Sequence, residues 1–246
     1  MLIALMADIH ANREAFEACL ADAREHGAER FVFLGDYVNY GADPEWVVQT
    51  LTGLVSNGAV AVLGNHDAAA CTFEETMDSP AATALEWTRV QLGAAERAFL
   101  AGLPVEVKED GRLYVHADAA APRRWIYVRD ASDALHSLGA TEGRMTFCGH
   151  VHEPAIYSVS AALKVTSFRP VAGAPVPLLP QRRWLCVLGS VGQPRDGDPS
   201  ACYALLDAGT SEMTYRRVPY DVDAAAAKIL AAGLPEELAE RLKWGR

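Results

Sequence analysis

The first quarter of the chain alternates between continuous apolar runs and segments with helical spacing. Three apolar runs are typical of strands buried on both faces: residues 2–7, 31–34 and 59–63. Between them, residues 12–27 and 43–54 carry apolar side chains every three to four positions, and Asn12 and Pro44 suit helix starts. This alternation of strand and helix predicts a parallel sheet with right-handed crossovers.

The middle of the chain is expected to contain a long helix, a hairpin and one more buried strand. Residues 80–100 fit a single helix, and residues 103–107 and 113–116 fit two strands that turn at Asp110-Gly111. Residues 145–148 form a further apolar run. Residues 117–139 have no regular period, so we expect an irregular insert there.

After residue 152 the pattern changes to short strands separated by turn residues. These strands are expected to pair antiparallel in a second sheet: residues 155–159, 163–165, 184–188, 202–206 and 213–218. Residues 168–180 contain four prolines and are expected to form a mobile loop, and residues 222–244 a helical tail. We expect a single domain over residues 1–246 that includes the insert and the tail.

Polar residues follow directly after five of the predicted strands. The central one is Asp36, which comes after Gly35 at the end of the run 31–34. The other strand ends supply further candidates: Asp8, His10, Asn65, His66, Asp67, His116, His150 and His152. In an open α/β sheet, ligands bind just outside the carboxyl ends of the strands. We therefore expect Asp36 to lie at the centre of a metal site shared by two ions.

The residue types at these strand ends favour a metal site. Carboxylate, imidazole and amide oxygen ligands suit Mn, Fe, Co, Ni or Zn. The spacing Asp8-x-His10 lets two ligands after one strand face a common ion, and His150-x-His152 repeats it. Each motif alone is also compatible with an ordinary turn or a core histidine. Together they use five of the seven histidines, which favours the metal site.

Composition restricts the classes of partner and compartment. The net charge of −10 argues against a broad nucleic-acid or anionic-membrane surface. The five cysteines are scattered and never in Cys-x-x-Cys spacing, so we expect free thiols in a reducing compartment. The apolar run at residues 2–7 is too short for a signal sequence or a membrane span, which predicts a cytoplasmic protein.

The polar motifs, in their order along the chain, resemble those of the calcineurin-like metallophosphoesterase superfamily: Asp8-x-His10, Gly35-Asp36, Gly64-Asn65-His66-Asp67, His116 and Gly149-His150-x-His152. Residues 35–41 and 189–195 are similar to its small bacterial and archaeal phosphodiesterase-like branch. The resemblance covers residues 1 to about 207. It implies an α/β fold, namely a four-layer α/β/β/α sandwich of two mixed sheets flanked by helices.

The resemblance also implies two metal sites and one catalytic histidine. The first ion would be bound by Asp8, His10, Asp36 and His152. The second ion would be bound by Asp36, Asn65, His116 and His150. His66 would be catalytic without binding metal. Protein-phosphatase members carry Asp and Arg where this chain has Asn39 and Tyr40, so Asn39 or Asp67 is left to orient His66.

These features predict a dinuclear metal-dependent phosphoesterase that hydrolyses phosphodiester or nucleotide-type substrates by a metal-activated hydroxide. A protonated His66 would donate to the leaving alkoxide or stabilise phosphoryl charge. The metals are expected to be Mn, Fe, Zn, Co or Ni. The alternatives are a phosphomonoesterase, including a protein Ser/Thr phosphatase, and a non-catalytic binding scaffold on the same fold.

Substrate contacts are expected from three further residues: Arg195, Asn39 and Tyr40. Arg195 could bind a phosphate with two hydrogen bonds, although an ordinary surface arginine fits nearly as well. A cluster of basic and aromatic residues could stack on a base or simply pack under a solvated loop: Arg123, Arg124, Trp125 and Tyr127. The expected partner is a small phosphate ester, and the sequence is compatible with a homo-oligomer.

Overall fold

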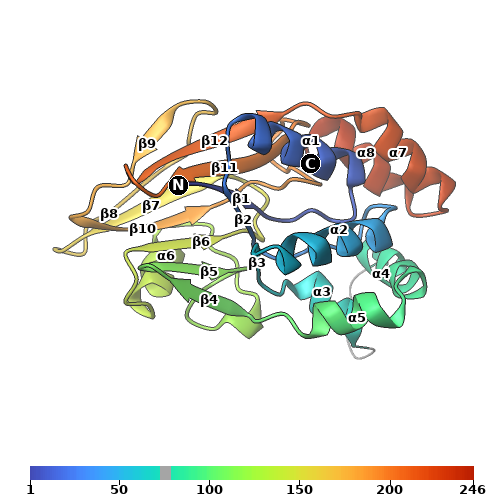
Figure 1. Ribbon diagram of the computed structural model, residues 1–246, viewed down its shortest axis with the longest axis horizontal. Coiled ribbons are helices and arrows are strands. Elements are labelled where there is room, and N and C mark those ends of the chain that lie inside the picture. The colour runs from blue at the N-terminus through green and yellow to red at the C-terminus, as the bar shows by residue number, and fades with distance from the viewer. Residues whose placement is uncertain (73–78) are drawn as a thin grey trace.

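The computed structural model describes residues 1–72 and 79–246. Its strands form two six-stranded sheets (Figure 1). The first sheet has the order β3-β2-β1-β11-β12-β9. Its strands are β1 (Leu2–Met6), β2 (Arg30–Phe33), β3 (Val60–Ala61), β9 (Pro175–Pro177), β11 (Ala201–Asp207) and β12 (Glu212–Val218). The second sheet has the order β4-β5-β6-β10-β7-β8. Its strands are β4 (Glu106–Glu109), β5 (Arg112–Val115), β6 (Met145–Cys148), β7 (Ala155–Ser160), β8 (Val165–Phe168) and β10 (Arg182–Val187).

Each sheet mixes parallel and antiparallel pairs. β1 pairs parallel with β2, and β2 with β3, which confirms the predicted parallel opening of the chain. The predicted hairpin is also present, because β4 pairs antiparallel with β5. In the second sheet, β6 lies parallel to both β5 and β10, whereas β7 pairs antiparallel with β10 and β8. The α/β fold with two mixed sheets is therefore confirmed.

One expectation about the sheets is wrong. The strands predicted at 202–206 and 213–218 do not belong to the second sheet, because β11 pairs antiparallel with the otherwise open edge of β1. Pairing there satisfies backbone groups that would otherwise form an unpaired sheet edge. It also buries both faces of β11, since Tyr203 packs on the helical side and Ala204 between the sheets. Pairing partners of this kind are not encoded in the local pattern of a strand.

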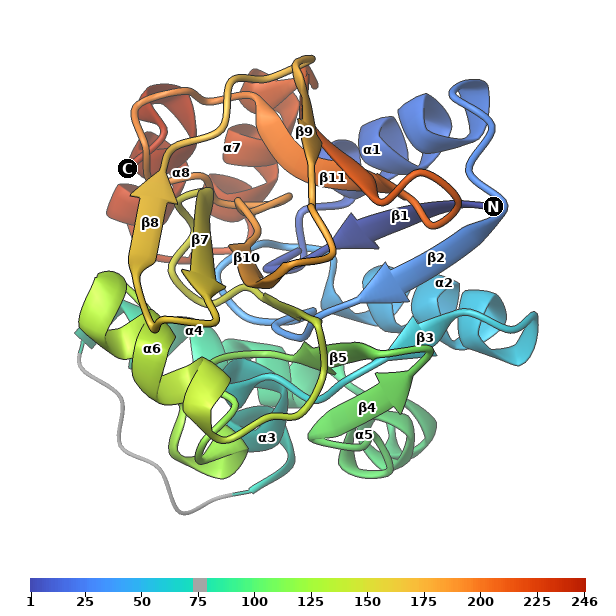
Figure 2. The same ribbon diagram turned by 90° about the vertical axis from the view of Figure 1, so that its left-hand side faces the viewer.

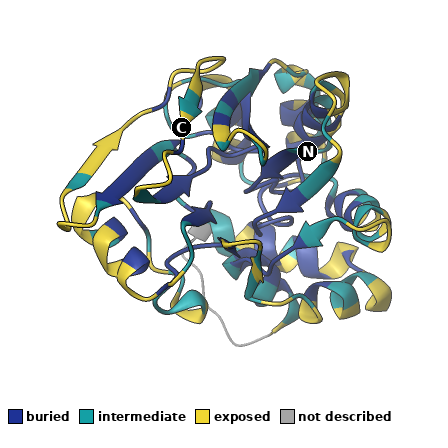
Figure 3. Cartoon of the chain, turned by 60° about the vertical axis from the view of Figure 1, so that its left-hand side comes forward, coloured by how far each residue is buried: buried dark blue, intermediate teal, exposed yellow. Residues whose placement is uncertain are grey.

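Eight helices are described outside the sheets: α1 (Arg13–Glu25), α2 (Pro44–Ser56), α3 (Asn65–Cys71), α4 (Ser79–Gln91), α5 (Ala94–Ala101), α6 (Ala131–Gly139), α7 (Val222–Ala231) and α8 (Glu236–Trp244). The sheets face each other, with α1 on the outside of the first sheet and α6 on the outside of the second (Figure 2). Side chains alternate accordingly along β1: Ile3 and Leu5 lie between the sheets, and Ala4 and Met6 face α1. Buried residues are concentrated in the strands, and exposed residues lie on loops and outer helix faces (Figure 3).

Several predicted elements differ from those observed. The helix expected at 80–100 is two helices, α4 and α5, because Gly93 has extended backbone and is the N-cap of α5. The tail at 222–244 is also two helices, separated by Gly233 with φ +71° and by Pro235. The strand expected at 163–165 is β8, which begins at Val165 after a turn.

The predicted insert and the predicted mobile loop both contain regular structure. Residues 131–139 form α6, and the Asp130 side chain caps it by accepting hydrogen bonds from the backbone N–H groups of Ser132 and Asp133. The insert also contains a 3₁₀ turn, η1 (Pro122–Arg124). Within the proline-rich segment, β9 pairs with β12 as an edge strand, a position that tolerates proline. None of the described helices is long and apolar enough to cross a membrane.

Candidate metal and phosphoester site

The predicted ligands lie on loops that leave neighbouring strands at one end of the two sheets. Backbone hydrogen bonds join these loops to one another. Asp8 N–H donates to Gly35 O at 3.0 Å, and Gly149 N–H donates to His116 O at 2.9 Å. The backbone alone thus holds together segments that lie far apart in the sequence.

The backbone around the site adopts a conformation that non-glycine residues seldom take. Positive φ angles between 49° and 72° occur at several predicted site residues: Asp8, His10, Asp36, Asn39, Tyr40, His150 and His152. The left-handed region costs free energy for residues with a Cβ, and such residues cluster at functional sites. The sharp turns aim each side chain out of its strand and toward the others.

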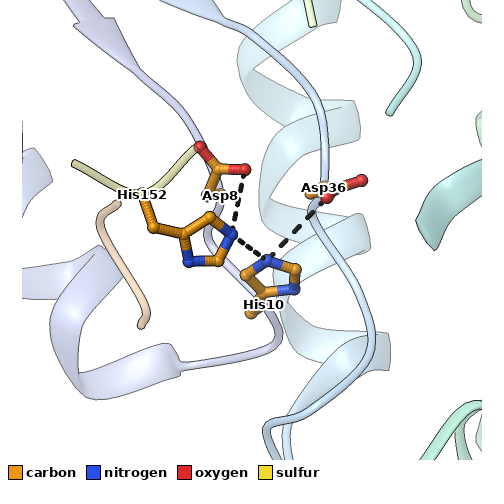
Figure 4. A group of neighbouring side chains, drawn as sticks. All are labelled: Asp8, His10, Asp36 and His152. Carbon is orange, nitrogen blue, oxygen red and sulfur yellow. Dashed lines mark hydrogen bonds and ion pairs between the residues drawn. The ribbon is translucent and has the colours of Figure 1, made fainter. Parts of the chain in front are cut away.

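A first group of potential ligands consists of Asp8, His10, Asp36 and His152 (Figure 4). One ligand atom of each lies within 4.8 Å of the others, and all four side chains are buried. His152 Nε2 is 3.4 Å from Asp8 Oδ1, and His10 Nε2 is 3.9 Å from Asp36 Oδ2. The structure therefore brings together the residues expected to bind the first ion.

A second group shares Asp36 with the first and adds His116 and His150. His116 Nε2 lies 3.2 Å from Asp36 Oδ2 and 3.1 Å from His150 Nδ1. Asn65 Oδ1 is 3.0 Å from the same Nε2 of His116. The four residues expected around the second ion are thus neighbours, with Asp36 between the two groups.

The four histidines of these groups are all oriented by the backbone. Each places one ring nitrogen on a carbonyl oxygen: His10 on Val38, His116 on Leu34, His150 on Trp125 and His152 on Gln193, at 2.7–3.2 Å. A ring nitrogen that faces a carbonyl must carry the proton, so the other nitrogen of each neutral ring has a lone pair.

The remaining nitrogens face one another in pairs. His10 Nε2 is 3.1 Å from His152 Nε2, and His116 Nε2 is 3.1 Å from His150 Nδ1. Burial lowers the pKa of His116, but Asp36 above all raises it to about 9, so Nε2 of His116 carries a proton when no cation is bound. Burial lowers the pKa of both His10 and His152, so their facing nitrogens are two acceptors, which repel at this distance unless a cation lies between them. Together with the nearby carboxylates, this donor set fits divalent metal ions.

Asp36 gives a second, independent indication of a cation. Its Oδ1 accepts a hydrogen bond from His66 N–H at 2.9 Å, but its buried Oδ2 has no hydrogen-bond partner among the described residues. Burial would raise the pKa of Asp36, but His116 above all, with His66 and His10, holds this pKa well below its usual range. The His116 imidazole lies 3.2 Å from this oxygen, and a divalent cation would compensate the buried carboxylate charge more strongly.

Asp8 shows the same need for positive charge. Burial is the main reason that its pKa rises to about 8, although His116 lowers it and Asp36 raises it further. Burial also lowers the pKa of His150 to about 3, which leaves the imidazole neutral. The protein alone therefore disfavours ionisation of a second carboxylate, and bound metal would reverse that preference.

The role of Asp67 differs from the one that the sequence suggests, which is to orient His66. Its buried carboxylate instead accepts hydrogen bonds from the backbone N–H groups of Asp36, Tyr37 and Gly64 at 2.8–3.0 Å. Asp67 therefore ties the loop that carries Asp36 to the start of α3. Its place in the first turn of a helix, three residues after Gly64, was a sequence signal for such capping.

His66 is oriented by Asn39. Asn39 Nδ2 lies 2.8 Å from His66 Nδ1, while Asn39 Oδ1 accepts from the backbone N–H of Tyr40 at 2.8 Å. The second contact determines which end of the amide faces the imidazole, so His66 Nδ1 accepts and Nε2 carries the proton. Burial lowers the pKa of His66. The geometry thus favours a neutral ring with Nε2–H on the side of Asp36, 3.9 Å from Oδ2, instead of the protonated ring expected from the sequence.

Tyr40 and Arg195 lie beside the ligand groups. The Tyr40 ring contacts the rings of His10 and His66, with centroids 4.6 and 4.8 Å apart. The Arg195 guanidinium lies over the Tyr40 ring at 6.0 Å and donates to Gln193 Oε1 at 3.0 Å. Both residues thus lie beside the ligand groups, and their contact with a substrate stays a prediction.

The predicted insert supports the second ligand group. The Tyr127 ring stacks on His150 at 4.0 Å, and the Trp125 ring contacts His116 edge-on at 5.9 Å. Trp125 and Tyr127 therefore pack against two of the candidate ligands, a contact that neither sequence interpretation of this cluster predicts. Arg123 and Arg124 are exposed and line a different hollow, near Val105.

Comparison with known proteins identifies the family. The family model described as a calcineurin-like phosphoesterase superfamily domain matches residues 1–211. The chain belongs to the calcineurin-like phosphoesterase superfamily. This membership, together with the buried Asp and His groups, makes it a metal-binding phosphoric ester hydrolase. The recognition from motif order is thereby confirmed.

Three relatives of this superfamily member span its whole length. An uncharacterized protein of Methanocaldococcus jannaschii is 32% identical over 100% of this chain and 98% of its own. The crystal structure of a metallophosphoesterase from Sphaerobacter thermophilus is 34% identical, with a TM-score of 0.89 over 100% of this chain and 99% of that one. A hypothetical protein from Pyrococcus horikoshii is 20% identical, with a TM-score of 0.81 over 100% and 98%, and shows the same fold.

Proposed function

We propose that this superfamily member hydrolyses phosphodiesters, including nucleotide-type esters, at a centre of two divalent cations. The observation that carries the proposal is the buried Oδ2 of Asp36, which lies between two groups of imidazole lone pairs and has no hydrogen-bond partner among the described residues. Asp8, His10, Asp36 and His152 would bind one ion. Asp36, Asn65, His116 and His150 would bind the other. The donor set suits Mn, Fe, Zn, Co or Ni.

The residues of the chain would position the ester and its leaving group. When bound, two divalent cations would neutralise the phosphoryl oxygens and lower the pKa of the attacking water. Neutral His66 would donate a hydrogen bond from its Nε2–H to the leaving oxygen or to a phosphoryl oxygen and stabilise the charge there, because Asn39 holds the opposite nitrogen. Arg195 would donate to a phosphate oxygen that the cations do not reach.

The charge around the site favours diesters over monoesters. A phosphomonoester is a dianion near neutral pH, whereas a diester carries one charge. Among the described residues, Arg195 has a guanidinium whose positive charge lowers the pKa values of both Asp8 and His66. Tyr40 stands where the protein-phosphatase branch has an arginine, so the second guanidinium of that branch is missing. One guanidinium matches a monoanionic diester better than a dianionic monoester.

The proposal is tested by comparing bis(p-nitrophenyl) phosphate with p-nitrophenyl phosphate after addition of Mn²⁺. We expect the larger kcat/KM for the diester, and loss of both activities in Asp36→Asn. Faster hydrolysis of the monoester would contradict the preference for diesters. Failure of freshly metallated protein to hydrolyse either ester would contradict the catalytic proposal as a whole.

A further inference from the structure

A groove lies next to the ligand groups, and its lining includes residues of the strands β7 and β8. These two strands lie side by side in Figure 2. Its volume is about 440 Å³, which is within the range of small-molecule sites. Its lining includes three arginines, one glutamate and one exposed aromatic residue: Arg129, Arg169, Arg195, Glu153 and Phe168. None of these residues was needed to build the ligand groups described above.

The groove and the ligand groups share three segments of the chain. Val151 lines the groove and lies between His150 and His152. Arg195 also lines it and reaches over Tyr40. The Arg129 guanidinium stacks on the Tyr127 ring at 4.0 Å. Tyr127 stacks in turn on His150, so a molecule bound at the ligand groups can extend directly into the groove.

The groove is locally basic in an acidic chain. Arg169 forms an ion pair with Glu153 at 2.9 Å. Among the described residues, neither the Arg129 nor the Arg195 guanidinium has a carboxylate within ion-pair distance. Two of the three guanidinium groups therefore remain available to an anion, although the whole chain carries a net charge of −10. A concave basic surface attracts and orients anionic ligands.

The groove also presents an aromatic ring. Phe168 ends β8 and is 42% exposed. An exposed phenylalanine beside an arginine gives a flat planar group both a stacking surface and a nearby cation. Phosphate and a flat aromatic ring occur together in nucleotides, whereas inorganic phosphate and sugar phosphates lack the ring.

We propose that the groove binds the nucleoside part of a nucleotide phosphodiester whose scissile phosphate lies at the ligand groups. Arg195 contacts the scissile phosphate, Arg129 lies beside the sugar and phosphate, and the base stacks on Phe168. The inference rests on the proposed function and names its substrate class.

The test uses two diesters with the same leaving group, p-nitrophenolate. One is the p-nitrophenyl ester of thymidine 5′-monophosphate, which carries a nucleoside. The other is methyl p-nitrophenyl phosphate, which has a methyl group in place of the nucleoside and therefore no second ring. We expect Phe168→Ala to lower the ratio of the two kcat/KM values about tenfold, because the base loses the ring on which it stacks. Arg129→Met should lower the ratio by a similar factor, because the guanidinium beside the sugar is removed. Arg123→Met is the matched control: it removes the same charge in the same segment, outside the groove, and should leave the ratio unchanged.

Equilibrium binding gives a second readout. Calorimetry with thymidine 5′-monophosphate should show affinity about tenfold weaker in Phe168→Ala than in wild type, with binding of inorganic phosphate retained. Hydrolysis of both esters with an unchanged ratio in Arg129→Met and Phe168→Ala would overturn the groove assignment and leave the proposed function intact. Failure of wild type to hydrolyse either ester would instead overturn the proposed function and the inference with it.

Discussion

At the scale of single residues, the Asn39–His66 pair distinguishes this site from that of the protein-phosphatase branch. An aspartate orienter would carry a negative charge and favour a protonated imidazole, whereas the Asn39 amide donates to Nδ1 and favours a neutral ring. The sequence identified both residues, because each sits in a recognisable motif. It left Asn39 and Asp67 as alternative partners of His66 and could not choose between them, since the choice depends on how the loop after β2 meets the start of α3.

The first prediction concerns leaving groups. His66→Asn should retain metal and fold but lower kcat about 10²–10³-fold for esters with alkoxide leaving groups, because a hydrogen bond from the Nε2–H of the neutral ring stabilises the charge that develops on the leaving oxygen. The loss should be smaller for p-nitrophenyl esters, because p-nitrophenolate delocalises that charge over its ring. Equal losses for the two kinds of ester would show that His66 stabilises phosphoryl charge instead. Loss of metal in the variant would show that it is a ligand.

A second prediction treats Asn39 as a positioning residue. Asn39→Ala should lower kcat about tenfold on alkoxide esters, because the imidazole loses the partner that holds Nδ1. In the His66→Asn background the same substitution should have little further effect, since it acts through His66. Additive losses in this double-mutant cycle would contradict the positioning role.

At the scale of elements, short loops with left-handed backbone place the ligands, and Asp67 holds two of these loops together. The strand ends and their polar residues could be predicted from the apolar runs that precede them. The residues at which helices end and new ones begin could be predicted less accurately than the strand ends. Helical spacing predicts one helix over residues 80–100, whereas Gly93 has extended backbone and starts α5. Residues 117–139 have no regular period, so the sequence does not predict α6 or its cap at Asp130.

A third prediction concerns the hydrogen bonds by which Asp67 holds two loops together. Asp67→Ala should lower the free energy of unfolding by at least about 3 kcal/mol, because buried backbone N–H groups of Asp36, Tyr37 and Gly64 lose their acceptor. Denaturant unfolding measures the loss. Asp207→Ala is the control, since Asp207 also accepts from backbone N–H groups but in an exposed turn. Similar losses of unfolding free energy in the two variants would contradict this role of Asp67.

At the scale of the whole molecule, the two sheets bring five strand ends to one place. The parallel opening and the hairpin could be predicted from local periodicity. The assignment of β11 and β12 to the first sheet could not, because any strand with two apolar faces can pair at either sheet. Asp22 on α1 is one of the long-range contacts that hold the final arrangement, since it pairs with Arg216 at 2.8 Å and accepts from the Tyr203 hydroxyl.

A fourth prediction follows from this contact. Burial raises the pKa of Asp22, but the hydrogen bonds from Arg216 and Tyr203 outweigh burial and lower it. A lowered carboxylate pKa stabilises the fold fully above the unfolded pKa of about 3.9, and this contribution is lost as pH falls through the folded value. The stability difference between wild type and Asp22→Asn should therefore shrink below about pH 4. A stability difference between the two proteins that stays constant with pH would contradict this prediction.

The central claim is a centre of two cations bridged by Asp36, and metal stoichiometry tests it most directly. Wild type, Asp36→Asn and His10→Ala would be loaded with Mn²⁺, freed of unbound metal and analysed for metal per chain by plasma mass spectrometry. We expect two ions in wild type, about one in His10→Ala and almost none in Asp36→Asn, because only Asp36 belongs to both ligand groups. Loss of a single ion in both variants, or one ion in wild type, would contradict the account.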